Sequence, residues 1–199
     1  MTNKAKRLAE VERKTKETKI RVRVDLDGAG RVEAATGIGF FDHMLDLLGR
    51  HALFDLSVTA AGDLAVDAHH TVEDVGIALG EAVAKALGDK AGLSRFGFAS
   101  VPMDEALAQA SLDLSGRGSL AFTGEFGAES VGEMPTEVVE DFLGAFCVNA
   151  GANAHLSLVA GRNAHHAVEA VFKALARALR EAVAIDPREK GVPSTKGIL

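Results

Sequence analysis

The chain has 199 residues, 47% of them hydrophobic and 25% charged, which is typical of a globular protein with a sizeable core. Its net charge of −6 argues against a nucleic-acid partner, because phosphate contacts usually require an excess of Lys and Arg. The sequence has no apolar run long enough for a membrane helix and no apolar segment near its start for a signal peptide, and its single Cys147 excludes an internal disulfide. These features predict a cytoplasmic protein that acts on small molecules, without a nucleic-acid or membrane partner.

The first half of the chain alternates between strand and helix patterns. Residues 19–26 alternate polar and apolar side chains, as a half-buried strand does, and Asp27-Gly28 ends this strand with a turn. Apolar residues at helical spacing predict a helix over 40–48, and residues 54–59 are predicted as a short strand. Residues 71–87 form an amphipathic pattern that predicts a second helix, which Gly88 ends.

The second half follows the same order of patterns. The predicted elements are strands over 102–114 and 119–126 around a turn at Gly116, a helix over 136–150 with Cys147 in its core face, a strand over 154–159 and a helix over 167–184. The last residues, 191–197, are predicted as a polar loop because they show no periodicity.

An internal duplication links the two halves. Residues 69–75 (HHTVEDV) and 165–171 (HHAVEAV) lie 96 positions apart, and each motif begins a predicted helix. We therefore predict two copies of one unit, residues 1–94 with an N-terminal arm and residues 95–199 with a C-terminal loop. Each copy alone is small for a stable core, so the copies are expected to pack helix face to helix face as one α+β domain.

The repeated motif places histidine and glutamate on one side of a helix. Residues three or four apart share a helix face, so His69 and His70 can both approach Glu73. Adjacent histidines diverge by about 100°, however, so each pair more naturally supplies two ions than one. His165, His166 and Glu169 repeat the arrangement, and two such helices could form two metal sites that each take histidine from both halves.

The metal interpretation has an alternative. A single His-His-x-x-Glu turn is also compatible with a polar helix start, in which the glutamate interacts with the helix dipole. Two turns at matching positions, together with His43 beside Asp42, favour a metal site. Imidazole and carboxylate without thiolate suit Mn, Fe, Ni or Zn, and the composition does not choose among these metals. His51 and His155 are isolated, and we interpret them as structural.

Several side chains are candidates for binding an anion or moving a proton. Phosphate is bound by cationic donors and hydroxyls, and the candidates are Arg95, Arg117, Lys173, Ser194, Thr195 and Lys196. Taken singly, each cation is more often a solvated surface charge. Residues 194–196 lack the glycine frame of a nucleotide-binding phosphate loop. The possible acids and bases are Glu17, Asp42, Asp67 and Asp104, which their spacing does not rank.

Five motifs, in order, resemble those of the imidazoleglycerol-phosphate dehydratase family. They are residues 36–45 (TGIGFFDHML), 69–74 (HHTVED), 112–117 (LDLSGR), 162–170 (RNAHHAVEA) followed by Phe172-Lys-Ala, and 192–197 (VPSTKG). The resemblance extends from about Arg13 to Leu199. It implies an α+β fold in which each half is a four-stranded sheet with two helices, the helices being sandwiched between the two sheets. It also implies self-association, in which trimers build a twenty-four-subunit shell with active sites at subunit interfaces.

The resemblance further implies a manganese cofactor, with two Mn²⁺ ions per active site. The ligands that it implies are His43, His69, His70, Glu73, His165, His166 and Glu169. Asp141 stands where some relatives have a further histidine, and a carboxylate could replace that histidine as a ligand.

The reaction that the resemblance implies belongs to histidine biosynthesis. D-erythro-imidazole glycerol phosphate loses water to give imidazole acetol phosphate, through a metal-bound imidazolate. Glu17 matches the family's acid–base glutamate, and Glu73 and Glu169 are expected to take part in catalysis with it. The expected substrate contacts are Glu17, Asp42, His69, Arg95, Arg117, Lys173, Ser194, Thr195 and Lys196. Relatives often have Gln and Pro where this chain has Leu47 and Gly118, which leaves the local substrate contacts open.

Two other functions are compatible with the metal motifs alone. A dinuclear metallohydrolase would use a bridging hydroxide to attack an ester or amide, and a phosphatase of this kind would release inorganic phosphate. A metal-stapled assembly protein would use the same motifs only to cross-link subunits, and would have no affinity for phosphorylated imidazoles.

Overall fold

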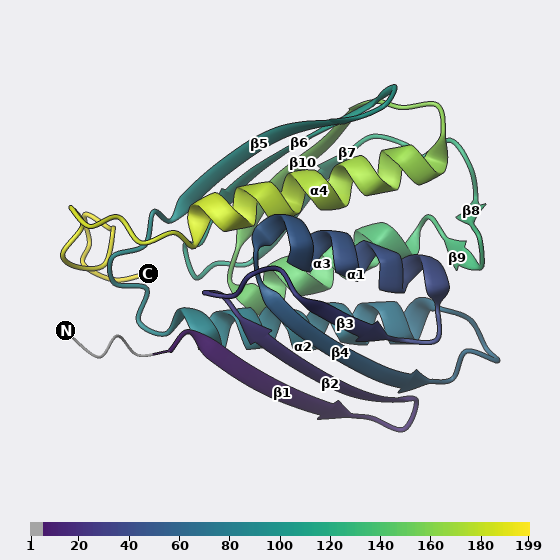
Figure 1. Cartoon of the computed structure of the whole chain (residues 1–199), viewed down its shortest axis with the longest axis horizontal. Coiled ribbons are helices and arrows are strands. Elements are labelled where there is room, and N and C mark those ends of the chain that lie inside the picture. The colour runs from purple at the N-terminus through teal and green to yellow at the C-terminus, as the bar shows by residue number, and fades with distance from the viewer. Residues whose placement is uncertain (1–5) are drawn as a thin grey trace.

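Two four-stranded sheets enclose a layer of four helices in the computed structural model, which describes residues 6–199 (Figure 1). The first half contains β1 (Leu8–Lys14), β2 (Thr18–Asp25), β3 (Val32–Ala35), α1 (Gly39–Ala52), β4 (Asp55–Gly62) and α2 (His69–Leu87). The second half contains β5 (Phe96–Met103), β6 (Ala106–Asp113), β7 (Ser119–Thr123), the short β8 (Ser130–Val131) and β9 (Met134–Pro135), α3 (Val138–Ala150), β10 (Asn153–Ala160) and α4 (Ala164–Ala182). Residues 1–5, at the start of the predicted first copy, lie outside the described residues.

The two sheets have the same topology. Their strand orders are β1-β2-β4-β3 and β5-β6-β10-β7, and the two sheets correspond strand for strand. In both, the first three strands are antiparallel and the last strand is parallel to its neighbour, β3 to β4 and β7 to β10. The predicted duplicated α+β fold, with helices between two sheets, is confirmed.

The strand β2 illustrates why the sheets form. Ile20, Val22 and Val24 alternate with charged residues and are at most 1% exposed, so one face of the strand lies in the core. Each such side chain contributes about 1.5–3 kcal/mol when fully buried. The alternation predicted this strand almost to the residue.

Two strand predictions need correction. Residues 102–114 are not one strand but parts of β5 and β6, which a tight turn at Asp104 and Glu105 connects. Proline has no backbone N–H to donate, and Pro102 is tolerated in β5 because β5 is an edge strand. The strands β1 and β3 were not predicted, because both are edge strands and Val11 is the only fully buried residue of either.

The helices pack in two crossed pairs. α2 packs against α3, and α1 packs against α4, so each pair takes one helix from each half. All four helices begin at the end of the molecule where β8 and β9 lie, and the C-terminal segment lies at the opposite end (Figure 1). Residues near the starts of helices from both halves are thereby brought to one end. Within residues 6–199, no helix combines the length and apolar character that a membrane span requires.

Two glycines allow the close contact of α2 with α3. A Cβ atom at Gly76 would lie 2.8 Å from the Phe142 carbonyl oxygen, and one at Gly80 would lie 2.6 Å from the Phe146 carbonyl oxygen. These glycines are four residues apart and so face α3 together. By contrast, a Cβ atom at Gly144 of α3 would approach no atom closer than 3.9 Å.

This difference predicts opposite effects of the same substitution. Gly144→Ala should raise the free energy of unfolding by up to about 1 kcal/mol, because alanine favours the helix. Gly80→Ala should instead lower it by about 1–3 kcal/mol, since the backbone of α3 must move away. Thermal unfolding of both variants at one protein concentration measures the effect. An equal increase in Tm for both variants would contradict the close packing.

Candidate functional site

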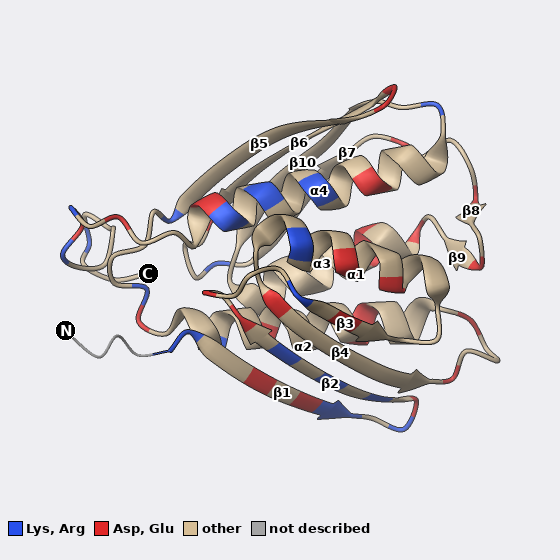
Figure 2. Ribbon diagram, viewed as in Figure 1, with Lys and Arg blue, Asp and Glu red and all other residues tan. Residues whose placement is uncertain are grey.

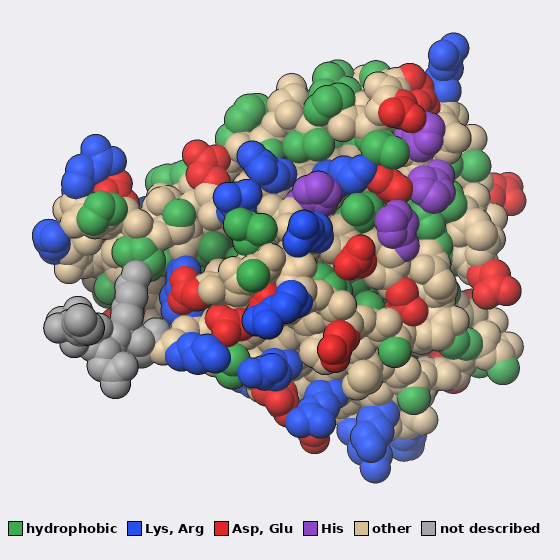
Figure 3. Space-filling view, viewed as in Figure 1, with side chains coloured by type: hydrophobic (Ala, Val, Ile, Leu, Met, Phe, Trp, Pro, Cys, Tyr) green, Lys and Arg blue, Asp and Glu red, His purple; other side chains and the backbone are tan. Residues whose placement is uncertain are grey.

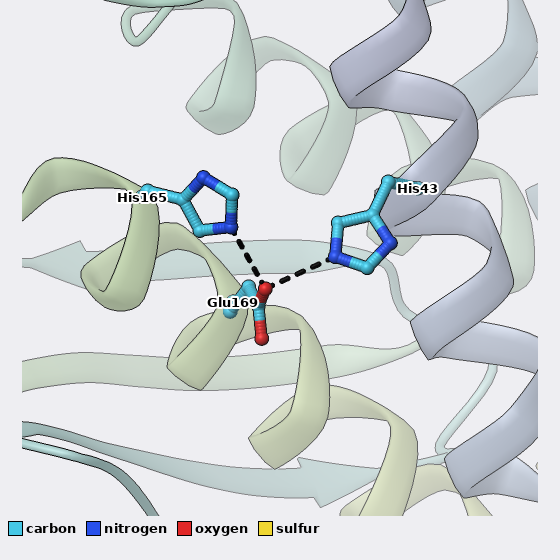
Figure 4. A group of neighbouring side chains, drawn as sticks. All are labelled: His43, His165 and Glu169. Carbon is cyan, nitrogen blue, oxygen red and sulfur yellow. Dashed lines mark hydrogen bonds and ion pairs between the residues drawn. The ribbon is translucent and has the colours of Figure 1, made fainter.

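The first histidine cluster joins α1 to α4. His43 of α1 and His165 of α4 both approach one carboxylate oxygen of Glu169, with their Nε2 atoms 3.0 Å and 2.9 Å from its Oε1 (Figure 4). The three donor atoms all lie within 4.8 Å of one another. Two ligand atoms on opposite sides of an ion, each bonded to it at about 2.0–2.2 Å, lie about twice that far apart, which is close to the limit of 4.8 Å within which these donor atoms lie. The donor set therefore fits a divalent transition-metal cation such as Mn²⁺ or Zn²⁺.

Glu169 is an ionised carboxylate inside the protein. Its side chain is only 7% exposed, and Lys173, one turn further along α4, donates to its Oε2 at 2.5 Å. Burial alone would raise the pKa of Glu169, but the hydrogen bonds from Lys173, His43 and His165 together lower that pKa to about 2. The negative charge needed by a metal ligand is thus present at neutral pH.

The second histidine cluster joins α2 to α3. His69 of α2 places Nδ1 at 3.2 Å from Oδ2 of Asp141 in α3, and its Nε2 at 3.8 Å from Oε2 of Glu73. The imidazole thus contacts the two carboxylates through different nitrogens, so these donors do not converge on one point as those of the first cluster do. Asp141 nonetheless stands in the second cluster where His43 stands in the first.

The two clusters correspond through the duplication. Each takes a His-x-x-x-Glu turn from one half and its remaining side chain from the other half. The side chains of the clusters come from the first two turns of their helices, and the four helices begin at one end (Figure 1). Histidine side chains gather on the surface near the start of α4 (Figure 3).

The second histidine of each motif points elsewhere. His69 and His70 contact different carboxylates, and so do His165 and His166, as expected for side chains that leave adjacent helix positions in different directions. His70 Nδ1 lies 3.0 Å from Asp63, and His166 Nδ1 lies 2.8 Å from Glu105. Neither His70 nor His166 belongs to the two clusters of this chain.

Carboxylates orient both of these histidines. Hydrogen bonds donated to Asp63 and to Glu105 raise the pKa of His70 and of His166 respectively. The bond to His166 and backbone N–H groups lower the pKa of Glu105 to about 2. When Nδ1–H donates to a carboxylate, the Nε2 lone pair is left for a metal. Helical spacing does not indicate Asp63 or Glu105, because Asp63 lies in the loop after β4 and Glu105 lies in the turn between β5 and β6.

A basic pocket forms where the C-terminal segment meets the turn after β6. The cavity has a volume of about 340 Å³, and its lining includes Arg95, Arg117, Ser194, Thr195 and Lys196. The structure thus brings together five of the six predicted phosphate-side residues.

The two arginines of the basic pocket differ in their partners. Arg95 donates to Asp113 at 2.7 Å and 3.0 Å and to the Pro193 carbonyl at 2.8 Å, so its guanidinium holds the C-terminal segment in place. Arg117 is exposed, and its side chain has no ion pair among residues 6–199. Arg117 is therefore free to bind an anion.

Lys173, the sixth candidate, lies apart from this pocket. It lies beside Glu169 and lines a different cavity, of about 770 Å³, together with His51, Arg177 and Arg180. Lys and Arg residues recur along α4 (Figure 2). Burial lowers the pKa of His51, with a further contribution from Lys173 and Arg177, so this histidine is not positioned as a cation.

The remaining candidates have separate environments. Glu17 lies in the turn between β1 and β2, with its side chain 54% exposed and its Oε2 3.9 Å from His70 Nδ1. Asp42 accepts hydrogen bonds from the amide and hydroxyl of Thr36, at 2.8 Å and 2.6 Å, and so fixes the loop before α1. Cys147 is buried, as predicted. His155, interpreted from the sequence as structural, is exposed on β10.

The histidine clusters and the basic pocket lie at opposite ends of the molecule. The clusters are at the helix starts, whereas the pocket is built on the C-terminal segment at the other end (Figure 1). A ligand of small size cannot contact both regions of one chain.

The relatives and solved structures described here share one name. The sequence model of the imidazoleglycerol-phosphate dehydratase family matches residues 36–179. The dehydratase of Acidiphilium cryptum is 59% identical over 97% of this chain and 99% of its own length, and that of Moorella thermoacetica is 58% identical over 97% and 98%.

Two solved structures of imidazoleglycerol-phosphate dehydratases have the same fold. The enzyme from Staphylococcus aureus superposes with a TM-score of 0.82 at 36% identity, covering 90% of this chain and 99% of its own. The Pyrococcus furiosus enzyme, in complex with (S)-C348, gives 0.82 at 35% identity over 95% and 100%. This chain belongs to the imidazoleglycerol-phosphate dehydratase family.

Proposed function

We propose that the chain dehydrates D-erythro-imidazole glycerol phosphate to imidazole acetol phosphate and water, as a cytoplasmic enzyme of histidine biosynthesis. The convergence of His43, His165 and Glu169 on one point, in a chain of this family, is the observation that carries the proposal. A metal site of this kind can bind an imidazole ring, and the basic pocket can bind a phosphate.

Two Mn²⁺ ions per active site are the proposed cofactors. The proposed ligands are His43, His69, His70, Glu73, Asp141, His165, His166 and Glu169. Histidine and carboxylate without thiolate are suitable donors for manganese. When bound, these ions would act as Lewis acids that favour the deprotonated form of the substrate imidazole.

The reaction requires one proton to leave a weakly acidic carbon. Dehydration removes the hydroxyl next to the imidazole ring and a proton from the neighbouring carbon, and the resulting enol becomes a ketone. Glu17 is proposed to move the proton, because its exposed carboxylate lies 3.9 Å from the ring of His70, a proposed ligand. Glu73 and Glu169 would hold their histidines and the ions in place.

The proposed active site requires more than one subunit. The histidine clusters and the basic pocket lie too far apart for one small substrate, so a second copy must supply the phosphate side. His70 and His166 likewise remain outside the clusters of their own chain. These features support the proposed assembly of trimers into a twenty-four-subunit shell.

Arg117 tests the phosphate side of the site. Arg117→Ala should raise KM by about 10-fold or more while changing kcat much less, because a charge-assisted contact to phosphate contributes about 1.5–3 kcal/mol. Steady-state kinetics measures the split between KM and kcat. Arg188→Ala is the matched control, since Arg188 is exposed and forms an ion pair with Asp186 near the same end. An unchanged KM for Arg117→Ala would contradict this assignment.

The activity itself is tested with imidazole glycerol phosphate. The purified protein should form the acetol phosphate without releasing inorganic phosphate, and chelation should stop the reaction until Mn²⁺ is restored. Release of inorganic phosphate would indicate a metallohydrolase instead. Metal binding without any affinity for the phosphorylated imidazole would indicate a metal-stapled assembly protein.

A further inference from the structure

We propose that Asp74 positions Glu17 for proton transfer by holding the turn between β1 and β2 against α2. This inference rests on the proposed function, because it concerns the acid–base role of Glu17. Asp74 follows the proposed ligand Glu73 directly, but points to the sheet side of α2, where its side chain is only 9% exposed.

Asp74 is bound to both strands that flank the turn. Its Oδ1 accepts a hydrogen bond from Nε of Arg13, at the end of β1, at 2.7 Å. Its Oδ2 accepts a hydrogen bond from the hydroxyl of Thr18, which begins β2 and is 4% exposed. One buried carboxylate therefore fixes the two ends of the turn to the helix that carries His69, His70 and Glu73.

The turn itself transmits this anchor to Glu17. Thr15 and Thr18 share a hydrogen bond of 3.1 Å between their hydroxyls. The hydroxyl of Thr15 also accepts hydrogen bonds from the backbone N–H of Glu17 at 3.1 Å and of Thr18 at 2.9 Å. A continuous series of hydrogen bonds thus runs from Asp74 through Thr18 and Thr15 to the backbone of Glu17.

In the second half of the chain, the corresponding turn is held by different hydrogen bonds. The corresponding turn, between β5 and β6, carries Glu105, whose carboxylate accepts hydrogen bonds from the backbone N–H groups of Arg162 and Asn163 and contacts His166. Ala170, fully buried, occupies the position that corresponds to Asp74. There the carboxylate itself is the anchor, so the turn needs no buried acid beneath it.

The buried acid of the first half replaces the contact that Glu105 makes in the second half. In the first half, the turn is held by Asp74 and not by a carboxylate of the turn itself. Among residues 6–199, the Glu17 carboxylate has no hydrogen bond, and its Oε2 lies 3.9 Å from Nδ1 of His70. A held backbone with a free carboxylate is the arrangement that an acid–base group needs.

Asp74→Ala, which reproduces the second-half residue, is the principal test in the metal-loaded protein. It should lower kcat by about 10- to 100-fold, because a shift of about 1 Å in a catalytic group has an effect of this size. KM should stay within about 2-fold and metal content should stay unchanged, since no proposed ligand or phosphate contact is removed. Thr18→Val should lower kcat in the same way. Thr18→Ser, which keeps the hydroxyl, should leave kcat near the wild-type value.

A double-mutant cycle separates positioning from structural damage. If Asp74 acts through Glu17, then adding Asp74→Ala to Glu17→Gln should change kcat by less than about 2-fold. Multiplied losses in the double variant, or normal kcat in Asp74→Ala and Thr18→Val, would overturn the proposal. Asp55→Ala is the matched control. Asp55 accepts hydrogen bonds from Arg31 and from the Ala29 N–H, at the end of β4 that is far from the turn of Glu17. Its replacement should lower Tm without lowering kcat.

The outcome also distinguishes this proposal from the function on which it rests. A wild-type protein without dehydratase activity would end the proposed function before Asp74 is tested. A Glu17→Gln variant with normal turnover would remove the role of Glu17 and the positioning role of Asp74 together. Loss of turnover in Glu17→Gln, with full turnover in Asp74→Ala, would overturn the positioning role alone.

Discussion

Replacing Glu17 by Gln should lower kcat by about 10²- to 10⁴-fold, the range that general acid–base catalysis contributes. The substitution keeps the size and the backbone hydrogen bonds of the residue but removes the group that accepts a proton. Glu17 lies in a turn whose backbone is held by Thr15, so Gln should occupy the same place. Turnover of imidazole glycerol phosphate under saturating Mn²⁺ measures the effect.

The control for this variant is Glu12→Gln. Glu12 lies on β1 with its side chain 71% exposed and forms an ion pair with Arg21, so its loss should leave kcat unchanged. Metal content should equal that of the wild type in both variants, because neither residue is a proposed ligand. A nearly normal rate for Glu17→Gln would assign the proton transfer to another group.

Replacing His165 by Ala should have the second largest effect, because it removes one of three converging donors. Glu169 would keep His43 and Lys173 as partners, but the remaining protein donors in the first cluster would be two. Metal binding at this site should weaken by about 100-fold or more, since losing even an indirect partner of a ligand costs about 10- to 100-fold. His69→Ala should have the same effect on the second cluster.

Metal analysis and sedimentation together measure this prediction. We expect both variants to lose bound metal and turnover, and to form a less stable assembly, because the proposed ions join subunits. His155→Ala is the control, since His155 is exposed on β10 and belongs to neither cluster. Unchanged metal stoichiometry in both His165→Ala and His69→Ala would contradict the ligand assignment.

Much of the fold could be predicted from the sequence where burial is one-sided and regular. The alternation in β2 and the amphipathic patterns of α2 and α4 placed these elements within a few residues of their actual bounds. The edge strands β1 and β3 could not be predicted in this way, because a strand with few buried side chains has almost no hydrophobic period. The crossed pairing of α1 with α4 and of α2 with α3 depends on tertiary packing and is not encoded in any local spacing.

The candidate site, too, could be predicted where helical spacing applies and not where distant segments meet. Helical spacing predicted that His165 and Glu169 share a face, and the resemblance implied His43; the structure brings the three side chains together. Spacing also predicted the divergence of adjacent histidines. It could not predict that Asp63 and Glu105 hold His70 and His166, or that Asp74 lies under the turn of Glu17, because these contacts join turns to helices far apart in sequence.

The central claim is that two His-x-x-x-Glu turns from the two halves bind a pair of cations. Anomalous diffraction from crystals of the assembled protein, saturated with Mn²⁺, tests it most directly. We expect two manganese peaks per active site, each bonded to side chains of these turns, with His165 and Glu169 at one ion and His69 and Glu73 at the other. Manganese bound elsewhere, or full dehydratase activity in crystals and solution without metal at either turn, would contradict this pair of sites.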